Sequence, residues 1–225
     1  MEEPMRKTRR IATVVGVAAG AVAFLAPSAS AAPTNWTISP SGANFTASAG
    51  TTTLTDDLGN QITCASSSAS GALKSSPQTG NPATLATVTA AAFNTPCNGP
   101  LGSTWTVSTG TPSWNIKGTD YTPGGGDNGT GLVTGFLDNI VSVHLTGDTI
   151  IGSCEFDVSG SVDGTYHNPG PGGSNGKLKV ADAGLHHLTI SNKTGPACSI
   201  VGDTATFAGD YTVLSGSTSP VITGS

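Results

Sequence analysis

The sequence predicts an all-β fold, an antiparallel β-sandwich or barrel in which helix is confined to an N-terminal export signal. Short runs of Thr, Val, Ile and Phe recur along the chain and are separated by Gly, Pro, Asn and Asp turn residues. After residue 31, no segment carries an apolar stripe at helical spacing. The four cysteines, an even number, are typical of a disulfide framework in an exported chain.

The first element, Met1 to Ala31, is predicted to be a signal peptide. A basic start is followed by an uncharged, Ala- and Val-rich run over 11–26, and Ala29-Ser30-Ala31 offers an A-x-A cleavage site. A membrane anchor is disfavoured because a spanning helix needs about 20 apolar residues. We therefore expect 32–225 to be a single secreted β domain, extracellular or loosely associated with the cell wall, with no membrane contact after signal cleavage.

Charge excludes one class of partner. Residues 32–225 hold five Lys, no Arg, 11 Asp and the single Glu155, which gives a formal net charge of −7. Nucleic-acid binding needs clustered Lys and Arg to replace counterions on phosphates, so no nucleic-acid partner is expected. Charged residues make up 10% of the whole chain, against about 25% in an ordinary soluble domain. This pattern indicates a folded, uncharged-polar β protein, which we expect to be monomeric and to need no cofactor.

The strand pattern is clearest in the second half of the chain. In Thr204 to Leu214 the apolar residues fall on one face, at alternate positions. Val141, Val143 and Leu145 alternate with polar residues, and Gly147-Asp148 predicts a tight turn into a strand over 149–151. Two longer Gly- and Pro-rich loops are expected at 123–131 and 168–176.

Two short motifs lie inside these loops. Residues 172–176 match G-x-S-x-G, the nucleophile elbow, and Gly124, Gly126 and Gly129 match G-x-G-x-x-G. Both motifs act through a following helix, and Lys177 to Val180 is instead predicted to be a strand. The two matches therefore indicate flexible loops.

The cysteines allow three pairings, and comparison of the two halves favours one. The segment around Cys97 (TVTAAAFNTPCNGPLGSTWTV) and the one around Cys198 (HLTISNKTGPACSIVGDTATF) share a strand, a Pro before the Cys, a Gly turn and a second strand. Cys64 and Cys154 each precede a Ser-Gly segment and a further strand. We interpret this as two degenerate repeats, over 35–112 and 113–214, each with its own disulfide: Cys64–Cys97 and Cys154–Cys198.

Three segments carry a resemblance to a known group: NWTISPSGANFTASAGTTTLTDDLGNQITCASSSASGALKSS, then CNGPLGSTWTV with PSWNIKGTDY, and TGPACSIVGDTATFAGDYTV. They resemble a family of uncharacterised secreted, disulfide-bearing β proteins from actinobacteria such as Streptomyces, across nearly the whole of 32–225. The resemblance implies export, β architecture and paired cysteines. It implies no catalytic residue, because the family has no established activity.

Glu155 and Asp157 are the candidate catalytic pair. At positions i and i+2 of a strand their side chains share a face, with Cα atoms about 6.5–7 Å apart. Carboxylates roughly 5–9.5 Å apart can run glycoside hydrolysis. That chemistry normally draws its acids from different strands in a deep cleft, so two solvated surface acids are the favoured interpretation and no catalytic residue is predicted.

Trp114 and Tyr121 are the candidate ligand-binding residues. The two aromatics flank one predicted hairpin and could stack on sugar rings as a carbohydrate-binding face. The competing interpretation is that Trp105 and Trp114 fill the core beside a disulfide, as scarce aromatics usually do.

No metal site is predicted. His186 and His187 are neighbours, so on a strand they point to opposite faces, with His186 on the side of Leu188. The Asp/Asn/Gly loops around Asp120, Asp127 and Asn128 offer the oxygen ligands that calcium prefers, but their spacing matches no EF-hand loop.

Together these patterns predict a secreted, non-catalytic β protein, either an envelope or extracellular-matrix component or a binding module for a wall glycan or a protein partner. Two alternatives remain open: a glycosidase-like secreted hydrolase that uses Glu155 and Asp157, and an adhesin or self-assembling coat protein built on unpaired edge strands.

Overall fold

Strands account for most of the chain that the computed structural model describes, residues 31–181 and 184–225. The predicted signal peptide lies outside the described residues, apart from Ala31. Residues Ala32–Ser225 form one compact unit. Every strand pairing in this unit is antiparallel, as the sequence predicts.

The strands follow one another along the chain and are joined by turns and loops. The first eight are β1 (Asn35–Ser39), β2 (Asn44–Ala49), β3 (Thr52–Asp56), β4 (Gln61–Cys64), β5 (Ser67–Leu73), β6 (Gln78–Thr79), β7 (Ala83–Phe93) and β8 (Cys97–Asn98). The remainder are β9 (Thr104–Ser108), β10 (Trp114–Thr122), β11 (Leu132–Thr149), β12 (Gly152–His167), β13 (Lys177–Val180), β14 (Leu188–Thr194), β15 (Thr204–Leu214) and β16 (Val221–Gly224). Two short 3-10 helices, η1 (Pro100–Gly102) and η2 (Pro196–Ile200), interrupt them. No helix within the described residues is long and apolar enough to cross a membrane.

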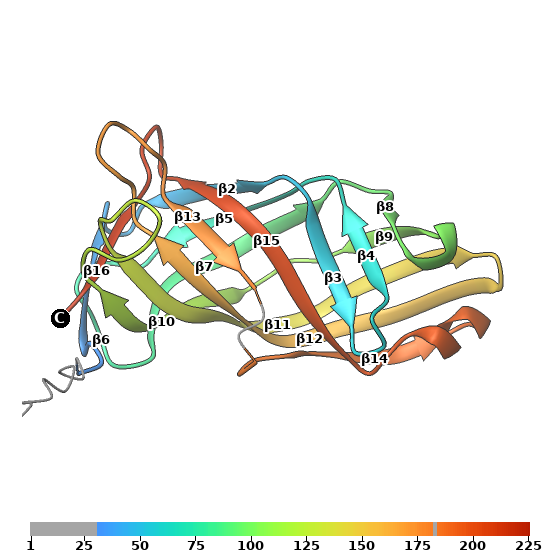
Figure 1. Ribbon diagram of the computed structural model, residues 1–225. Helices are drawn as coiled ribbons and strands as arrows, with labels where there is room; N and C mark the ends of the chain where they lie inside the picture. The colour runs from blue at the N-terminus through green and yellow to red at the C-terminus, as the bar shows by residue number, and fades with distance from the viewer. Residues whose placement is uncertain (1–30, 182–183) are drawn as a thin grey trace, which may run out of the picture. The chain divides into compact units, whose positions relative to one another are not determined.

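Backbone pairing closes the main sheet on itself twice (Figure 1). One ring, here called the capped ring, runs β2-β5-β7-β10-β11-β12-β13-β15 and back to β2. The other, the disulfide ring, runs β3-β4-β8-β9-β11-β12-β14-β15 and back to β3. The long strands β11, β12 and β15 belong to both rings. Of the two predicted architectures, the pairing gives a barrel.

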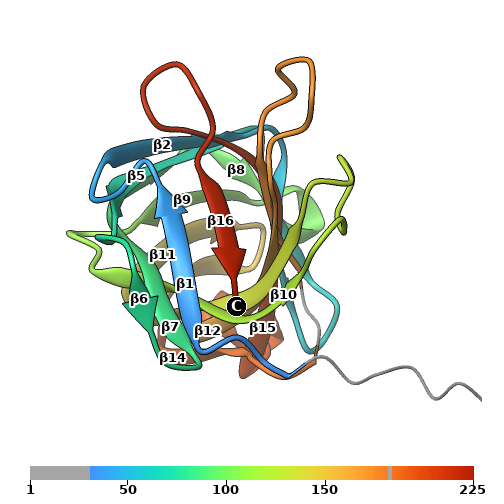
Figure 2. The same ribbon diagram turned by 90° about the vertical axis from the view of Figure 1, so that its left-hand side faces the viewer.

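A separate three-stranded sheet, β16-β1-β6, covers the open end of the capped ring (Figure 2). Its inward side chains Trp36, Ile38 and Ile222 are buried. A Cβ placed on Gly118 of β10 would lie 2.9 Å from the indole of Trp36. The Trp36 side chain therefore packs directly against the barrel wall. The cap therefore closes the barrel with apolar side chains.

The opposite end is closed by covalent links and aromatic rings. Cys64–Cys97 joins β4 to β8, and Cys154–Cys198 joins β12 to η2, so the predicted pairing is confirmed. Between them the rings of Trp105 and Phe156 lie 5.4 Å apart, centroid to centroid. These groups fill the far part of the disulfide ring.

The shared motif around Cys97 and Cys198 has a local counterpart in the structure. Each half places a cysteine and a 3-10 helix between two longer strands, as β7-β8-η1-β9 and β14-η2-β15, but Cys97 lies in β8 before η1 whereas Cys198 lies within η2. The two segments 35–112 and 113–214 are nevertheless interleaved, since β2 pairs with β15, β7 with β10 and β9 with β11.

The local predictions hold in most places. β15 spans the predicted Thr204–Leu214, β13 spans Lys177–Val180, and 123–131 and 168–176 connect strands as loops. Two predictions for β11 are wrong. Its hairpin turns at Ile150-Ile151 rather than at Gly147-Asp148, and Val141 is exposed although Val143 and Leu145 are buried. Register shifts on both sides of Ile140 reverse the facing of Val141.

Candidate functional site

The barrel contains an internal cavity of about 160 Å³, counted as the volume that the centre of a water molecule can occupy. The cavity is bounded by inward-facing side chains of both rings and of the cap. They include Val88, Val133 and Tyr166 of the capped ring, Val107 and Leu145 of the disulfide ring, and Ile222 of the cap. The surface open to this cavity is almost entirely apolar. We take it as the candidate functional site.

Small side chains at inward positions create the cavity. An eight-stranded barrel has an interior just wide enough for its side chains to fill, or to hold one small ligand. Here Ala47, Ala69, Ala86 and Ala91 line the cavity, and Ala69 lies directly opposite Ala91 across β5 and β7. Because methyl groups occupy positions where Leu or Phe would close the gap, space is left along the axis.

An unfilled cavity of this size is costly. At about 24 cal/mol per Å³, 160 Å³ corresponds to a stability loss on the order of 4 kcal/mol. Apolar cavities of about 150 Å³ stay dry and bind benzene or xenon, because water finds no hydrogen-bond partners in them. A small apolar molecule would therefore gain the contacts that the barrel wall lacks.

Two residues that line the cavity also carry unsatisfied polar atoms. Thr52 Oγ1 and Trp114 Nε1 are buried and have no hydrogen-bond partner within the described part of the chain. Native structures contain few such groups, and each one calls for an explanation. A bound molecule with one polar group could satisfy either atom.

The proposed aromatic binding pair, Trp114 and Tyr121, does not form an exposed surface. Both residues lie on β10 and do not flank a hairpin. Trp114 is only 6% exposed and lines the cavity, while Tyr121 packs half-buried against the core. The prediction of a stacking face is therefore wrong for Trp114, and the competing interpretation, in which Trp105 and Trp114 belong to the core, is confirmed.

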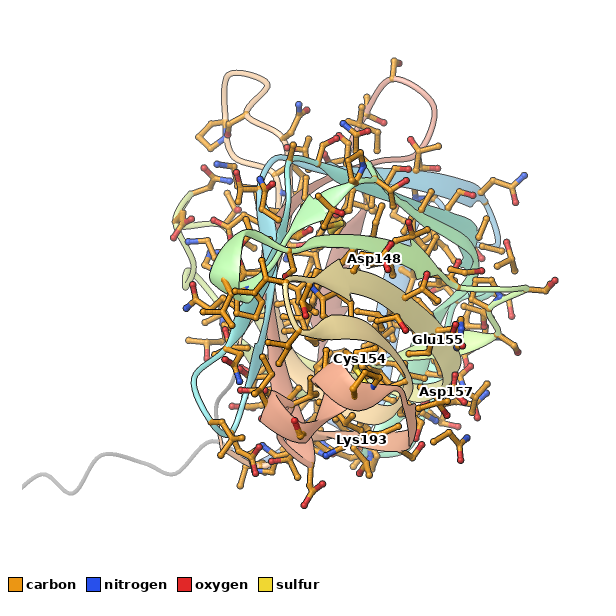
Figure 3. The ribbon with its side chains drawn as sticks, turned by 90° about the vertical axis from the view of Figure 1, so that its right-hand side faces the viewer. Asp148, Cys154, Glu155, Asp157 and Lys193 are labelled. Carbon is orange, nitrogen blue, oxygen red and sulfur yellow. A yellow bond between two sulfur atoms is a disulfide. The ribbon has the colours of Figure 1, made fainter. Side chains whose placement is uncertain are left out.

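Glu155 and Asp157 share the outer face of β12, as the alternation predicts. Figure 3 shows them beside each other on the outside of the wall. Asp157 is held by two partners: Asn192 Nδ2 donates to Oδ2 at 2.8 Å, and His144 Nδ1 lies 2.9 Å from Oδ1. His144 Nε2 is 4.0 Å from Glu155 Oε2. The four side chains form a small surface cluster that does not line the cavity.

The electrostatics of this cluster favour an ionised Asp157. The Asn192 amide and then the His144 imidazole hold its pKa below the ordinary value. A glycosidase acid needs a carboxyl whose pKa is raised, so that it still carries a proton near neutral pH. Asp157 has the opposite shift, and the Glu155 side chain is 53% exposed. Asp157 therefore does not fit the role of the general acid, and its contacts are hydrogen bonds at the surface.

His186 lies in the segment before β14 and contacts β12 and β11. Its Nδ1 lies 2.6 Å from Asp163 Oδ1, and its ring stacks on Phe136 with centroids 4.2 Å apart. Asp163 also accepts the backbone N–H groups of Leu185 and His186. These bonds fasten the segment before β14 to the outer wall of β12. β14 begins only at Leu188, so the predicted alternation of His186 with Leu188 on one strand is wrong.

The loops considered for calcium use their polar groups internally. The Asp127 carboxylate is 2.7 Å from Lys179 Nζ, which lowers its pKa, and the Asn128 amide donates to the carbonyl of Asn168. Asp120 accepts the N–H of Tyr121. Within the described ranges, no three His, Cys, Asp or Glu side chains gather as a metal site would require.

The cavity was not identified from the sequence, although part of its signal is present there. The alternation in TASA, SASGAL and AAAF places Ala at inward positions of β2, β5 and β7. That these alanines surround one space depends on the ring closure, which brings β15 beside both β2 and β3. No local pattern encodes that closure.

Comparison with known proteins gives no assignment: no protein-family model, no curated protein and no solved structure matches the chain.

Proposed function

We propose that this chain is an exported, non-catalytic binding protein that holds a small apolar molecule inside its barrel. The cavity of about 160 Å³ with an apolar wall carries the proposal. Export is supported by the predicted signal sequence and by the two disulfides, since disulfides persist in oxidising compartments outside the cytosol. Such a protein would work outside the membrane or in loose association with the cell wall.

The other roles considered for the chain have less support. A glycan-binding face based on Trp114 has less support because the Trp114 side chain is buried in the core. A hydrolase based on Glu155 and Asp157 has less support because the pKa of Asp157 is lowered and both carboxyls lie on the outside of the wall, away from the cavity (Figure 3). Self-assembly through edge strands has less support because both rings of the barrel are closed by backbone pairing, although β6 and β16 remain the outer strands of the three-stranded cap.

The test is a binding experiment on protein recovered in its oxidised form from the culture medium of the producing cells. Methyl NMR spectra would be recorded while 1-octanol and, separately, toluene are added. We expect saturable shifts of the inward methyl groups of Val88, Val133 and Val158, because these residues line the cavity. Val141 and Val221 are 51% and 42% exposed and serve as internal controls. Absence of saturable shifts with both compounds would overturn the proposal, as would equal shifts at the exposed valines.

A further inference from the structure

The cavity extends along the barrel rather than forming a compact chamber. On β11 alone its lining runs from Val133, near the cap, to Leu145 in the disulfide ring. At about 3.3 Å per residue this segment covers about 40 Å of strand, or about 30 Å along the axis at the usual strand tilt. Ile222 and Pro220 border the cavity at one end, and Cys64 and Val107 border it toward the other.

Its volume is small for such a length. Spread over about 30 Å, 160 Å³ leaves the centre of a water molecule a mean cross-section of about 5 Å². If the space is divided evenly over this length and a water radius of about 1.4 Å is added on each side, the mean width from wall to wall is about 5 Å. A hydrocarbon chain one methylene thick is about 4 Å across, judged from carbon–carbon contact distances. A fused ring system is wider than this mean width, whereas an extended hydrocarbon chain fits within it.

We infer that the occupant is a single unbranched hydrocarbon chain that lies along the barrel axis. This inference rests on the proposed function and narrows the ligand to one shape. Free fatty acids, fatty alcohols and the acyl chain of a lipid share this chemistry. The wall contributes contacts along the whole chain, so affinity should grow with chain length until the cavity is full.

The test compares linear and compact ligands of equal carbon number. Isothermal titration of the oxidised protein would use 1-hexanol, 1-octanol, 1-decanol and 1-adamantanol, with decanoate as the charged counterpart of 1-decanol. We expect 1:1 binding of 1-decanol and a rise of about fourfold in affinity per methylene, the equivalent of about 0.8 kcal/mol per buried CH₂. We expect 1-adamantanol to bind at least tenfold more weakly than 1-decanol. Tighter binding of decanoate than of 1-decanol would identify a fatty acid, and the reverse an uncharged chain.

A matched pair of variants tests whether the bound hydrocarbon chain lies inside the barrel. Ala91 faces inward and lines the cavity, whereas its neighbour Ala92 is exposed. Ala91→Leu adds bulk to empty space and should lower the affinity for 1-decanol at least tenfold, while Ala92→Leu should leave it unchanged. Cooperative urea unfolding of both variants would show that they are folded.

The outcomes separate the two proposals. If 1-adamantanol binds as tightly as 1-decanol, or if affinity does not change with chain length, the linear-chain inference is overturned while the apolar-ligand function stands. Equal binding of 1-decanol by Ala91→Leu and Ala92→Leu would also overturn the inference, because the chain would then lie elsewhere. If none of the compounds binds, both proposals fail.

Discussion

Asn168 shows how much one buried polar side chain can hold in place. It is 1% exposed and lies directly after β12. Its Nδ2 donates to the carbonyl of Ile222 at 2.7 Å, and its Oδ1 accepts the N–H of the same residue at 2.8 Å. Nearby, the hydroxyl of Tyr166 donates to the carbonyl of Pro220. These bonds fasten β16, and with it the cap, to the end of the barrel.

Replacement of Asn168 by Ala should therefore destabilise the protein strongly. Asn168→Ala leaves a buried N–H and a buried carbonyl of Ile222 without partners, at about 1–3 kcal/mol each, so we expect a loss on the order of 3 kcal/mol. Tyr166→Phe removes one donor and should cost about 1 kcal/mol. Urea unfolding measures both. Asn35→Ala, on the exposed face of β1, should stay within about 0.5 kcal/mol of the native protein. A loss for Asn168→Ala no larger than that for Asn35→Ala would contradict this role.

Asp163 makes the free energy of unfolding depend on pH in the acidic range. Burial by itself would raise the pKa of this carboxyl, but the His186 imidazole and the N–H groups of Leu185 and His186 outweigh it, and the pKa is lowered in the fold. A lowered folded pKa contributes stability above the unfolded value of about 3.9. That contribution is lost as the pH falls through the folded pKa.

We therefore expect the unfolding free energy of the native protein to fall as the pH is lowered below about 4. Asp163→Asn lacks the titrating group and should show a shallower decline. Urea midpoints measured at intervals between pH 6 and pH 2 would reveal the difference. Parallel curves for the two proteins would assign the acid sensitivity to other carboxyls, such as Asp157, whose pKa is also lowered.

At the scale of single elements, the sequence predicts strands where alternation is unbroken. β15 and β13 have the predicted bounds because nothing interrupts their two-residue period. β11 departs from prediction because Asn139 has a positive φ of 57° and the register shifts around Ile140. Such a bulge depends on the neighbouring strand, which alternation within β11 does not describe. The position of the hairpin turn is missed for the same reason: Gly147 and Asp148, the residues of the predicted turn, are still paired with β9.

The disulfides act on elements that have few hydrogen bonds of their own. Cys64–Cys97 holds β8, a strand of only two residues, and Cys154–Cys198 holds the short helix η2. The bonds close separations of 33 and 44 residues. Loops of this size should stabilise the fold by up to about 4 kcal/mol each in the chain-entropy model.

Paired alanine variants would test this contribution. We expect Cys64→Ala/Cys97→Ala and Cys154→Ala/Cys198→Ala each to lower the unfolding free energy, with values up to about 4 kcal/mol, measured by urea denaturation. Each pair must be replaced together, so that no free thiol remains to exchange. A loss below about 1 kcal/mol in either double variant would show that β8 or η2 is held by packing alone.

At the scale of the whole molecule, the β class, the antiparallel pairing and both disulfides follow from the sequence. The double closure does not, because it depends on where strands far apart in the chain meet: β15 contacts β3 with its first half and β2 with its last residues. The cavity could not be predicted from the sequence for the same reason. Its walls come from strands throughout the chain, so composition indicates small residues but not the space between them. The carboxylates that alternation does bring together, Glu155 and Asp157, lie outside that space.

Because β11, β12 and β15 belong to both rings, the unfolding of one ring is linked to the unfolding of the other. Neither ring can open completely without removing wall strands from the other, although the two enclose different parts of the core. The two rings should therefore unfold as one cooperative unit. Trp105 in the disulfide ring and Trp114 in the capped ring would then lose their buried environments over the same range of denaturant, and no half-barrel would accumulate.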